Sequence, residues 1–111
     1  MRSSKFEKEI GKRLGKRTKS KVSPISYTSH HKYTADYVMH DEKSNKTTYV
    51  EVKGRFRTSA EAAKYLDIKK SLKHNEELVF VFMYPDRKVL NYKTQTYRQW
   101  AEKHEFEVWE L

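Results

Sequence analysis

The sequence predicts an α/β fold in which helices pack against a mixed β-sheet. Segments rich in β-branched and aromatic residues alternate along the chain with amphipathic helical patterns, two of which begin at a capping signal. The length of 111 residues is enough for one hydrophobic core and too short for two. We therefore expect one domain with one active or binding surface.

A basic helix or arm is expected over residues 1–21, and residues 22–111 are expected to form the rest of the domain. An apolar residue at every fourth position predicts a short helix over residues 4–14, and these residues are Phe6, Ile10 and Leu14. Residues 1–21 carry nine basic and two acidic side chains, a net charge of +7 out of +9 for the chain. The polar stretch 16–32 is expected to be a linker or an exposed extended segment.

A β-hairpin is expected in the middle of the chain. Residues 33–39 (YTADYVM) and 47–53 (TTYVEVK) are rich in residues that favour strands. The polar sequence DEKSNK between them is typical of a turn. The two strands are therefore predicted to pair.

Two helices are expected in the second half of the chain, and both begin at a capping-box pattern. Thr58 and Glu61 predict a helix over residues 59–73. Thr96 and Gln99 predict another that ends near residue 104.

Three further strands complete the predicted sheet. The continuous apolar run 78–84 is of strand length and predicts a central buried strand. Residues 89–93 and 106–111 predict shorter strands.

Composition excludes several classes of protein. Only 36% of the residues are hydrophobic and the mean hydropathy is -1.03, so we expect neither a membrane span nor a membrane partner. The first 20 residues lack the apolar core of a secretory signal, and without cysteine a disulfide scaffold, thiol catalysis and cysteine-ligated zinc are excluded. The positive charge predicts a cytoplasmic protein that binds nucleic acid through its phosphates. The alternative is that the basic N-terminal region is only a solvated charged face or a ribosome-associated tail.

Charged side chains converge in the predicted hairpin. Glu51 and Lys53 project to one face of their strand, and pairing brings Asp36 beside Glu51. Facing carboxylates suit Mg²⁺ or Mn²⁺, and a nearby lysine orients water or stabilises developing charge in phosphodiester hydrolysis. The alternative is an exposed cross-strand salt-bridge cluster worth about 0 to 1 kcal/mol.

The surroundings of these residues resemble a known family. SHHKYTADYV followed by TTYVEVKG is similar to the active-site hairpin of the bacteriophage endonuclease I family of Holliday junction resolvases, a branch of the PD-(D/E)xK nucleases. FEKEI resembles the short first helix of that family, and TYRQWAEKHEFEV resembles its C-terminal helix and strand. The resemblance runs from Phe6 to Val108 and implies a restriction-endonuclease-like fold.

The resemblance also implies roles for individual residues. The implied metal ligands are Asp36, Glu51 and the backbone carbonyl of Val52, with Mg²⁺ or Mn²⁺ as the cofactor. The implied catalytic residues are Glu7, Asp36, Glu51 and Lys53, with Glu9 a less favoured choice than Glu7.

An intertwined homodimer is a further implication of the resemblance. In such a dimer the N-terminal element of one subunit completes the partner's site, and the stretch 16–32 crosses between subunits. A monomeric mass in light scattering would contradict this expectation. The sequence departs from the family at Ala35, where the motif usually has proline, and in lacking a basic C-terminal tail.

Substrate contacts are expected from basic residues in the N-terminal arm and just after the predicted hairpin. These are Lys5, Lys12, Arg13, Lys16, Arg17, Lys19, Arg55 and Arg57. Lysines of the second helix add to this group, namely Lys64, Lys69, Lys70 and Lys73. His30 and His31 are interpreted as exposed linker residues, not as ligands. Large apolar residues on the amphipathic elements are interpreted as core or dimer contacts rather than base-stacking groups: Tyr65, Leu66, Trp100, Phe106 and Trp109.

The sequence thus predicts a Mg²⁺-dependent, structure-selective DNA endonuclease that acts on four-way junctions or other branched DNA. Within the enzyme class, the alternative is a nicking or homing-type endonuclease with the same catalytic core. From another class, the alternative is a non-catalytic basic DNA- or RNA-binding module whose acids are structural.

Overall fold

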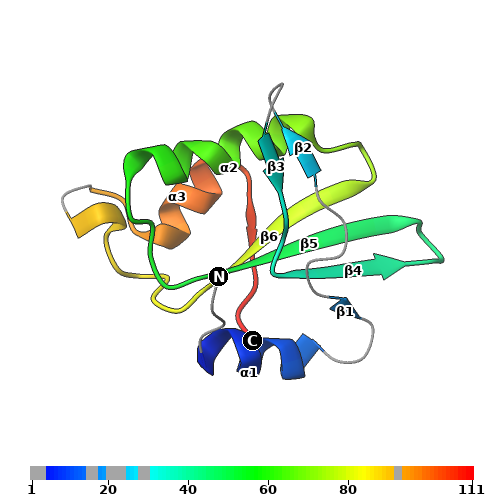
Figure 1. Cartoon of the computed structure of the whole chain (residues 1–111). Coiled ribbons are helices and arrows are strands. Elements are labelled where there is room, and N and C mark those ends of the chain that lie inside the picture. Colours follow the sequence, from blue (N-terminus) through cyan, green and yellow to red (C-terminus); the bar gives the residue numbers. More distant parts are fainter. Residues whose placement is uncertain (1–4, 15–17, 20–24, 28–30, 92–93) are drawn as a thin grey trace.

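A five-stranded mixed sheet forms the middle layer of the molecule in the computed structural model, which describes residues 5–14, 18–19, 25–27, 31–91 and 94–111 (Figure 1). Its strands are β1 (Thr18–Lys19), β4 (Tyr37–Asp41), β5 (Lys46–Lys53), β6 (Glu76–Phe82) and β7 (Glu107–Val108), in the spatial order β1-β4-β5-β6-β7. β1, β4 and β5 pair antiparallel, whereas β5, β6 and β7 pair parallel.

Helices cover both faces of this sheet. α1 (Lys5–Leu14) lies on one face, and α2 (Ser59–Ser71) and α3 (Tyr97–Lys103) lie on the other (Figure 1). A two-stranded sheet of β2 (Ile25–Tyr27) and β3 (His31–Tyr33) stands beside α2. The predicted fold class, a mixed sheet flanked by helices, is confirmed. Within the described ranges, no helix has both the length and the apolar character that crossing a membrane would require.

The main core lies between the sheet and the pair α2 and α3, and it is largely aromatic. Phe80 on β6 has no exposed surface, and its ring centroid lies 5.0 to 5.6 Å from those of Tyr65, Phe82, Trp100 and Phe106. Such ring pairs stabilise a core by roughly 0.5 to 1.5 kcal/mol each beyond the area that they bury. The expectation that Tyr65, Trp100 and Phe106 belong to the core is therefore confirmed.

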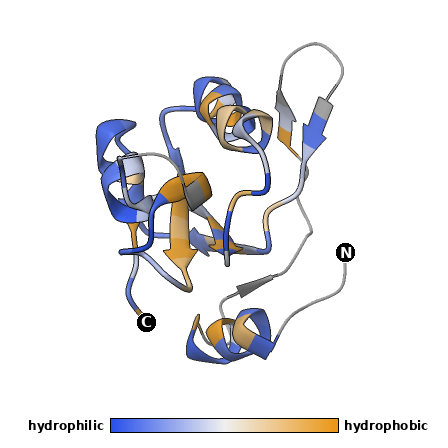
Figure 2. Cartoon of the chain, turned by 90° about the vertical axis from the view of Figure 1, so that its left-hand side faces the viewer, coloured by the Kyte–Doolittle hydropathy of each residue, from blue (hydrophilic) through white to orange (hydrophobic). Residues whose placement is uncertain are grey.

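A smaller apolar cluster joins α1 to the opposite face. Ile10 is buried against Val50 and Val81, and Phe6 and Leu14 pack around them. The predicted apolar stripe of the first helix is confirmed. Hydrophobic residues accordingly concentrate in the middle of the molecule, and the outward side of α1 is hydrophilic (Figure 2).

The stretch 16–32 differs from the expected linker. β1 extends the sheet by pairing with β4, and Ile25 of β2 is buried in the main core. The edge of β4 provides backbone hydrogen-bonding groups with which β1 pairs. The composition of residues 16–32, which is rich in Ser and Lys, does not predict this pairing. Residues 20–24 and 28–30 lie outside the described residues.

Two predicted strands near the C-terminus also differ. Val89–Asn91 forms a 3₁₀ turn in which Leu90 has a φ of 56°, and residues 92–93 lie outside the described residues. The last strand pairs only over Glu107–Val108, where it meets Val79 and Phe80. The backbone N–H of Val89 donates to the Gln95 carbonyl at 2.8 Å, and Lys88 forms an isolated bridge with Thr96, so this segment pairs with the residues before α3 and does not join the sheet.

Gly11 on α1 faces the Tyr37 side chain of β4. A Cβ atom at Gly11 would lie 2.5 Å from the Tyr37 Oη, and that hydroxyl donates a hydrogen bond of 2.8 Å to the backbone carbonyl of Glu7. A side chain at Gly11 would therefore push the Tyr37 ring away from the helix.

We expect Gly11→Ala to lower the free energy of unfolding by roughly 1 to 3 kcal/mol, the usual cost of overpacking. Alanine favours a helix by about 1 kcal/mol over glycine. A less stable variant would therefore mean that the clash with Tyr37 outweighs helix propensity, and a more stable one would mean the reverse. Urea denaturation measures the change. The matched control is Gly54→Ala, because no described atom lies within 4 Å of a Cβ there, and its stability should stay within about 0.5 kcal/mol of the wild type. A Gly11→Ala variant about 1 kcal/mol more stable than the wild type would show that α1 can shift without cost.

Candidate active site

Two buried carboxylates meet where the chain enters β4. The predicted strand 33–39 is interrupted, so Asp36 lies at a bend immediately before Tyr37, the first residue of β4. Tyr37 pairs with Val50, and this register places Asp36 next to Glu51. The Asp36 Oδ2 accepts a hydrogen bond of 2.9 Å from the backbone N–H of Val52. Asp36 and Glu51 are only 3% and 4% exposed.

Burial governs the ionisation of Glu51. Desolvation, and then the nearby Asp36 carboxylate, raise the pKa of Glu51 from 4.5 to about 8, although Tyr33 and Lys53 oppose the shift. A carboxylate held in this way favours a proton or a cation as its partner. The pair is therefore unlike an exposed cross-strand salt bridge.

The hydroxyl of Tyr33 holds the Glu51 carboxylate in place. Tyr33 lies at the end of β3 and donates to the Glu51 Oε1. Tyr65 of α2 lies near the same carboxylate, and burial together with the charge of Glu51 raises the pKa of both tyrosines. Both hydroxyls consequently stay protonated. Tyr33 is in the YTAD motif, but its role depends on the bend that follows it, which the alternation pattern does not predict.

Lys53 is held between two acids at the end of β5. Its Nζ lies 2.7 Å from the Glu61 Oε2 and 3.8 Å from the Glu51 Oε2. The Glu61 Oε1 accepts a hydrogen bond of 2.7 Å from the backbone N–H of Arg57. Burial alone would raise the pKa of Glu61, but the hydrogen bonds from Lys53 and Arg57 lower it overall. Glu61 thus fixes the position of the Lys53 ammonium.

The predicted capping box of α2 forms only in part. Thr58 accepts a hydrogen bond from the backbone N–H of Glu61, as expected. The Glu61 carboxylate does not return to Thr58, because Arg57 and Lys53 occupy it. At α3, by contrast, Thr96 and Gln99 form both halves of the box.

Glu7 of α1 lies on the other side of the sheet. It is 6% exposed, and its carboxylate lies close enough to Tyr37 to contribute, after burial and together with Asp36, to the raised pKa of that tyrosine. In the described part of the chain, however, no three side chains of Asp, Glu or His form a group that could hold a metal ion. Glu7 therefore does not complete a three-ligand cluster with Asp36 and Glu51.

The remaining donors still fit a magnesium ion. They are the carboxylates of Asp36 and Glu51, and the backbone carbonyl of Val52 on the strand between Glu51 and Lys53. Mg²⁺ is commonly held by one or two carboxylates, with water and substrate phosphate in the other positions. The oxygen atoms of these three groups are hard donors of the kind that Mg²⁺ prefers.

The predicted DNA-contact residues have different surroundings. Lys5, Lys12, Arg55 and Arg57 are exposed, whereas Arg13 is bound to Glu9 at 2.8 Å and to the backbone carbonyl of Leu111. Lys69, from the second helix, donates to the carbonyl of His104 at 2.7 Å. Lys16, Arg17 and His30, and the side chains of Lys19 and His31, lie outside the described residues.

The fold of the chain is similar to that of one solved repair endonuclease. No model of a protein family and no curated protein sequence matches the chain. The crystal structure of a repair endonuclease from Pyrococcus abyssi is similar, with a TM-score of 0.51 and 18% sequence identity, over 100% of this chain and 48% of that one. The similarity shows a restriction-endonuclease-like fold and leaves membership of the endonuclease I family a prediction. The chain spans about half the length of that protein.

In metal-free buffer, we expect Glu51→Gln to be more stable than the wild type at pH 7, by on the order of 3 kcal/mol. Below pH 4.5 the carboxyl is protonated in both the folded and the unfolded chain and costs nothing. Between pH 4.5 and about 8, the unfolded chain releases a proton that the folded chain keeps, so wild-type stability falls as the pH rises. Urea denaturation at pH 5 and pH 8 in EDTA measures the difference. Parallel pH profiles for the two proteins would contradict this account.

Proposed function

We propose that this chain is a Mg²⁺- or Mn²⁺-dependent DNA endonuclease that hydrolyses phosphodiester bonds in branched DNA. The observation that carries the proposal is the buried pair Asp36 and Glu51, with the Lys53 ammonium held 3.8 Å from Glu51. A buried carboxylate pair opposes folding, and a divalent cation would offset that cost. The restriction-endonuclease-like fold supports this interpretation.

In this mechanism, each described side chain has a defined task. A divalent ion held by Asp36, Glu51 and the Val52 carbonyl would polarise the scissile phosphate and activate water. Tyr33 orients the Glu51 carboxylate by donating to it.

Lys53 supplies a fixed positive charge beside this site. The hydrogen bond that Lys53 donates to Glu61 holds its ammonium in one place, and the position of the Nζ 5.5 Å from the Tyr65 ring centroid limits its motion further. A charge that does not have to reorganise stabilises the negative charge developing on a phosphate more strongly than a mobile one does.

The choice of DNA as the substrate is supported by the charge of the chain and by its similarities to other proteins. A net charge of +9 and the exposed lysines of α1 suit a partner that carries phosphates. The solved neighbour is described as a repair endonuclease, and this chain is similar to 48% of it. Branched DNA and an intertwined homodimer come from the resemblance of the hairpin to the endonuclease I family, and both stay predictions.

Cleavage of a synthetic four-way junction and of a linear duplex with the same arms, in Mg²⁺ or EDTA, tests the proposal. Paired nicks near the branch should require Mg²⁺ and should fall by about 10³-fold in Glu51→Gln, because a transition-state contact is lost. The matched control is Glu77→Gln, an isosteric change of a β6 carboxylate that pairs with Lys46 at 3.2 Å. Its cleavage should equal that of the wild type.

Other outcomes would select one of the alternatives. Equal cutting of the linear duplex would favour a nicking or homing-type endonuclease. Tight binding without cleavage in Mg²⁺ or Mn²⁺ would overturn the enzyme proposal and favour a nucleic-acid-binding module.

Glu61→Gln should lower the cleavage rate constant by about tenfold with little change in KM, because the neutral amide holds the ammonium less firmly. The effect should vanish in a Lys53→Ala background, since the two residues act as a unit. Thr58→Ala is the structural control: it removes the cap of α2, costs about 1 kcal/mol of stability and leaves Lys53 untouched. Equal rate losses in Glu61→Gln and Thr58→Ala would mean that Glu61 acts only through the helix.

A further inference from the structure

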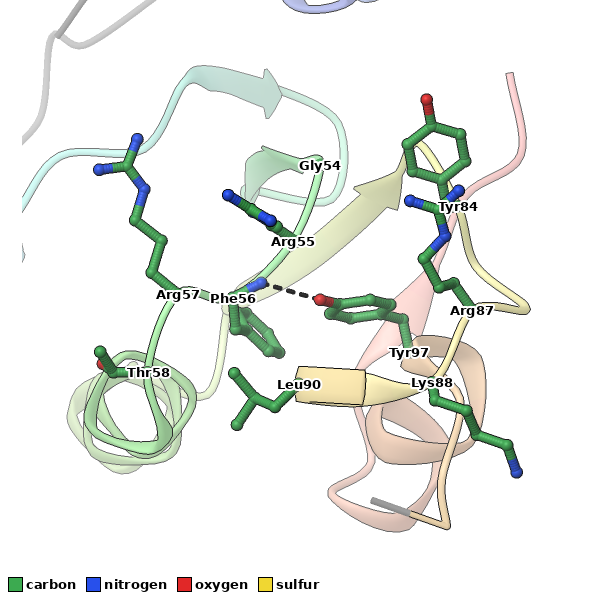
Figure 3. A pocket seen from close by; sticks show the side chains of 10 residues that line it. All are labelled: Gly54, Arg55, Phe56, Arg57, Thr58, Tyr84, Arg87, Lys88, Leu90 and Tyr97. Carbon is green, nitrogen blue, oxygen red and sulfur yellow. Dashed lines mark hydrogen bonds between the residues drawn. The ribbon is translucent and has the colours of Figure 1, made fainter. Parts of the chain in front are cut away.

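A groove begins at the residue that follows Lys53. One wall is formed by residues 54–58, between β5 and α2, and the other by residues around the turn after β6, including Tyr84 and Arg87 (Figure 3). Its volume is about 780 Å³, within the range of pockets that bind small ligands. Tyr97 lies at the base, where its hydroxyl accepts a 3.0 Å hydrogen bond from the Phe56 backbone and ties the two walls together.

The groove is strongly basic. Arg55, Arg57 and Arg87 extend their guanidinium groups toward the same side of it (Figure 3), and none of its lining residues is acidic. The ion pairs found among the described residues involve none of these three arginines. Asp86 is adjacent in sequence to Arg87, but it binds Arg98 at 3.1 Å. Among the described residues, no carboxylate forms an ion pair with these three guanidinium groups.

One of these arginines is positioned by an exposed aromatic ring. The guanidinium of Arg87 lies 4.0 Å from the ring centroid of Tyr84. Tyr84 is 43% exposed, which is exceptional among the large hydrophobic side chains of the described structure, where only Leu111 is comparable. Such a stacked pair holds the planar guanidinium in a fixed orientation at the rim of the groove.

Gly54 leaves the end of the groove next to Lys53 open. No described atom of the chain lies within 4 Å of a Cβ atom built at Gly54, so internal packing does not require glycine there. Close approach of a ligand to the backbone is another reason for a glycine.

We propose that this groove binds the sugar-phosphate backbone of a single nucleic-acid strand and leads it past Gly54 to Lys53. Planar guanidinium groups bind phosphate in bidentate geometry, and grooves that combine cations with an exposed aromatic ring are typical of single-strand binding. The hollow has the size of a small-ligand pocket, so it admits a short stretch of one strand and not a double helix. The direction of the strand toward a cleavage site rests on the proposed function, whereas the binding itself does not.

Fluorescence anisotropy in EDTA tests the binding without cleavage. The probes are a labelled 12-residue oligo(dT), a 12-base-pair duplex and labelled thymidine monophosphate, each titrated over a series of salt concentrations. Arg55→Gln/Arg87→Gln removes one charge from each wall. The matched control, Lys43→Gln/Lys103→Gln, removes the same charge from exposed positions in the β4–β5 turn and at the end of α3.

The arginine double variant should bind oligo(dT) about tenfold more weakly than the control double variant at 50 mM salt, and its log–log salt slope should be shallower by about 1.4, or 0.7 per lost phosphate contact. Gly54→Leu should weaken oligo(dT) binding while its thermal midpoint stays close to that of the wild type. Thymidine monophosphate should bind far more weakly than the oligonucleotide.

Three results would overturn the inference. One is equal oligo(dT) affinity in the arginine and control double variants, and another is a loss confined to the duplex. The third is mononucleotide binding as tight as that of the strand, which would indicate a nucleotide site. The anisotropy assay measures binding alone. If the wild type failed to cleave DNA but the arginine variant still lost oligo(dT) binding, the proposed function would be refuted and this inference would stand.

Discussion

The parallel pairing of β5 with β6 is the constraint from which the rest of the structure follows. Pairing of Glu51 with Phe80 sets which side chains of β5 face which layer. Val50 and Val52 face α1, and Glu51 and Lys53 face α2. One strand therefore carries apolar packing on one side and two of the candidate site residues, Glu51 and Lys53, on the other. A shift of one residue would exchange the two faces, so core and site share a single register.

The site and the core make opposite contributions to stability. Burial of Glu51 next to Asp36 disfavours the folded chain above pH 4.5, where the unfolded chain releases the Glu51 proton. The aromatic cluster around Phe80 lies directly behind them in the same layer and favours it. Tyr65 belongs to both, since its ring packs against Phe80 and the charge of Glu51 raises the pKa of its hydroxyl. The charged site is thus attached to the aromatic core.

Sequence reasoning was most successful where a short-range pattern decides the structure. Alternation along residues 47–53 was sufficient to place Glu51 and Lys53 on one face, and hairpin pairing brought Asp36 beside them. The capping signal at Thr58 correctly placed the start of α2. The identity of the Lys53 partner could not be read in this way. Glu61 matches a capping box by its spacing, and only the approach of α2 to the end of β5 diverts its carboxylate to Lys53.

The missed short strands have a similar cause. β1, and the pair of β2 with β3, depend on an edge of β4 and on a face of α2 that are far away in sequence. Local composition in this region is polar and carries little strand signal. Tyr33 was overlooked as a partner of Glu51 because the bend between β3 and β4 turns it toward the site.

The docking of α1 has a consequence for the order in which the chain is assembled. The helix packs against Val50 and Val81, with Trp109 beside them, and Arg13 reaches the carbonyl of Leu111. Its binding surface is therefore assembled from distant parts of the sequence, and forming it requires loops that enclose nearly the whole chain. The sheet must be largely complete before α1 finds its position. The helix, which carries four of the nine basic side chains of residues 1–21, is thus the last layer to be added.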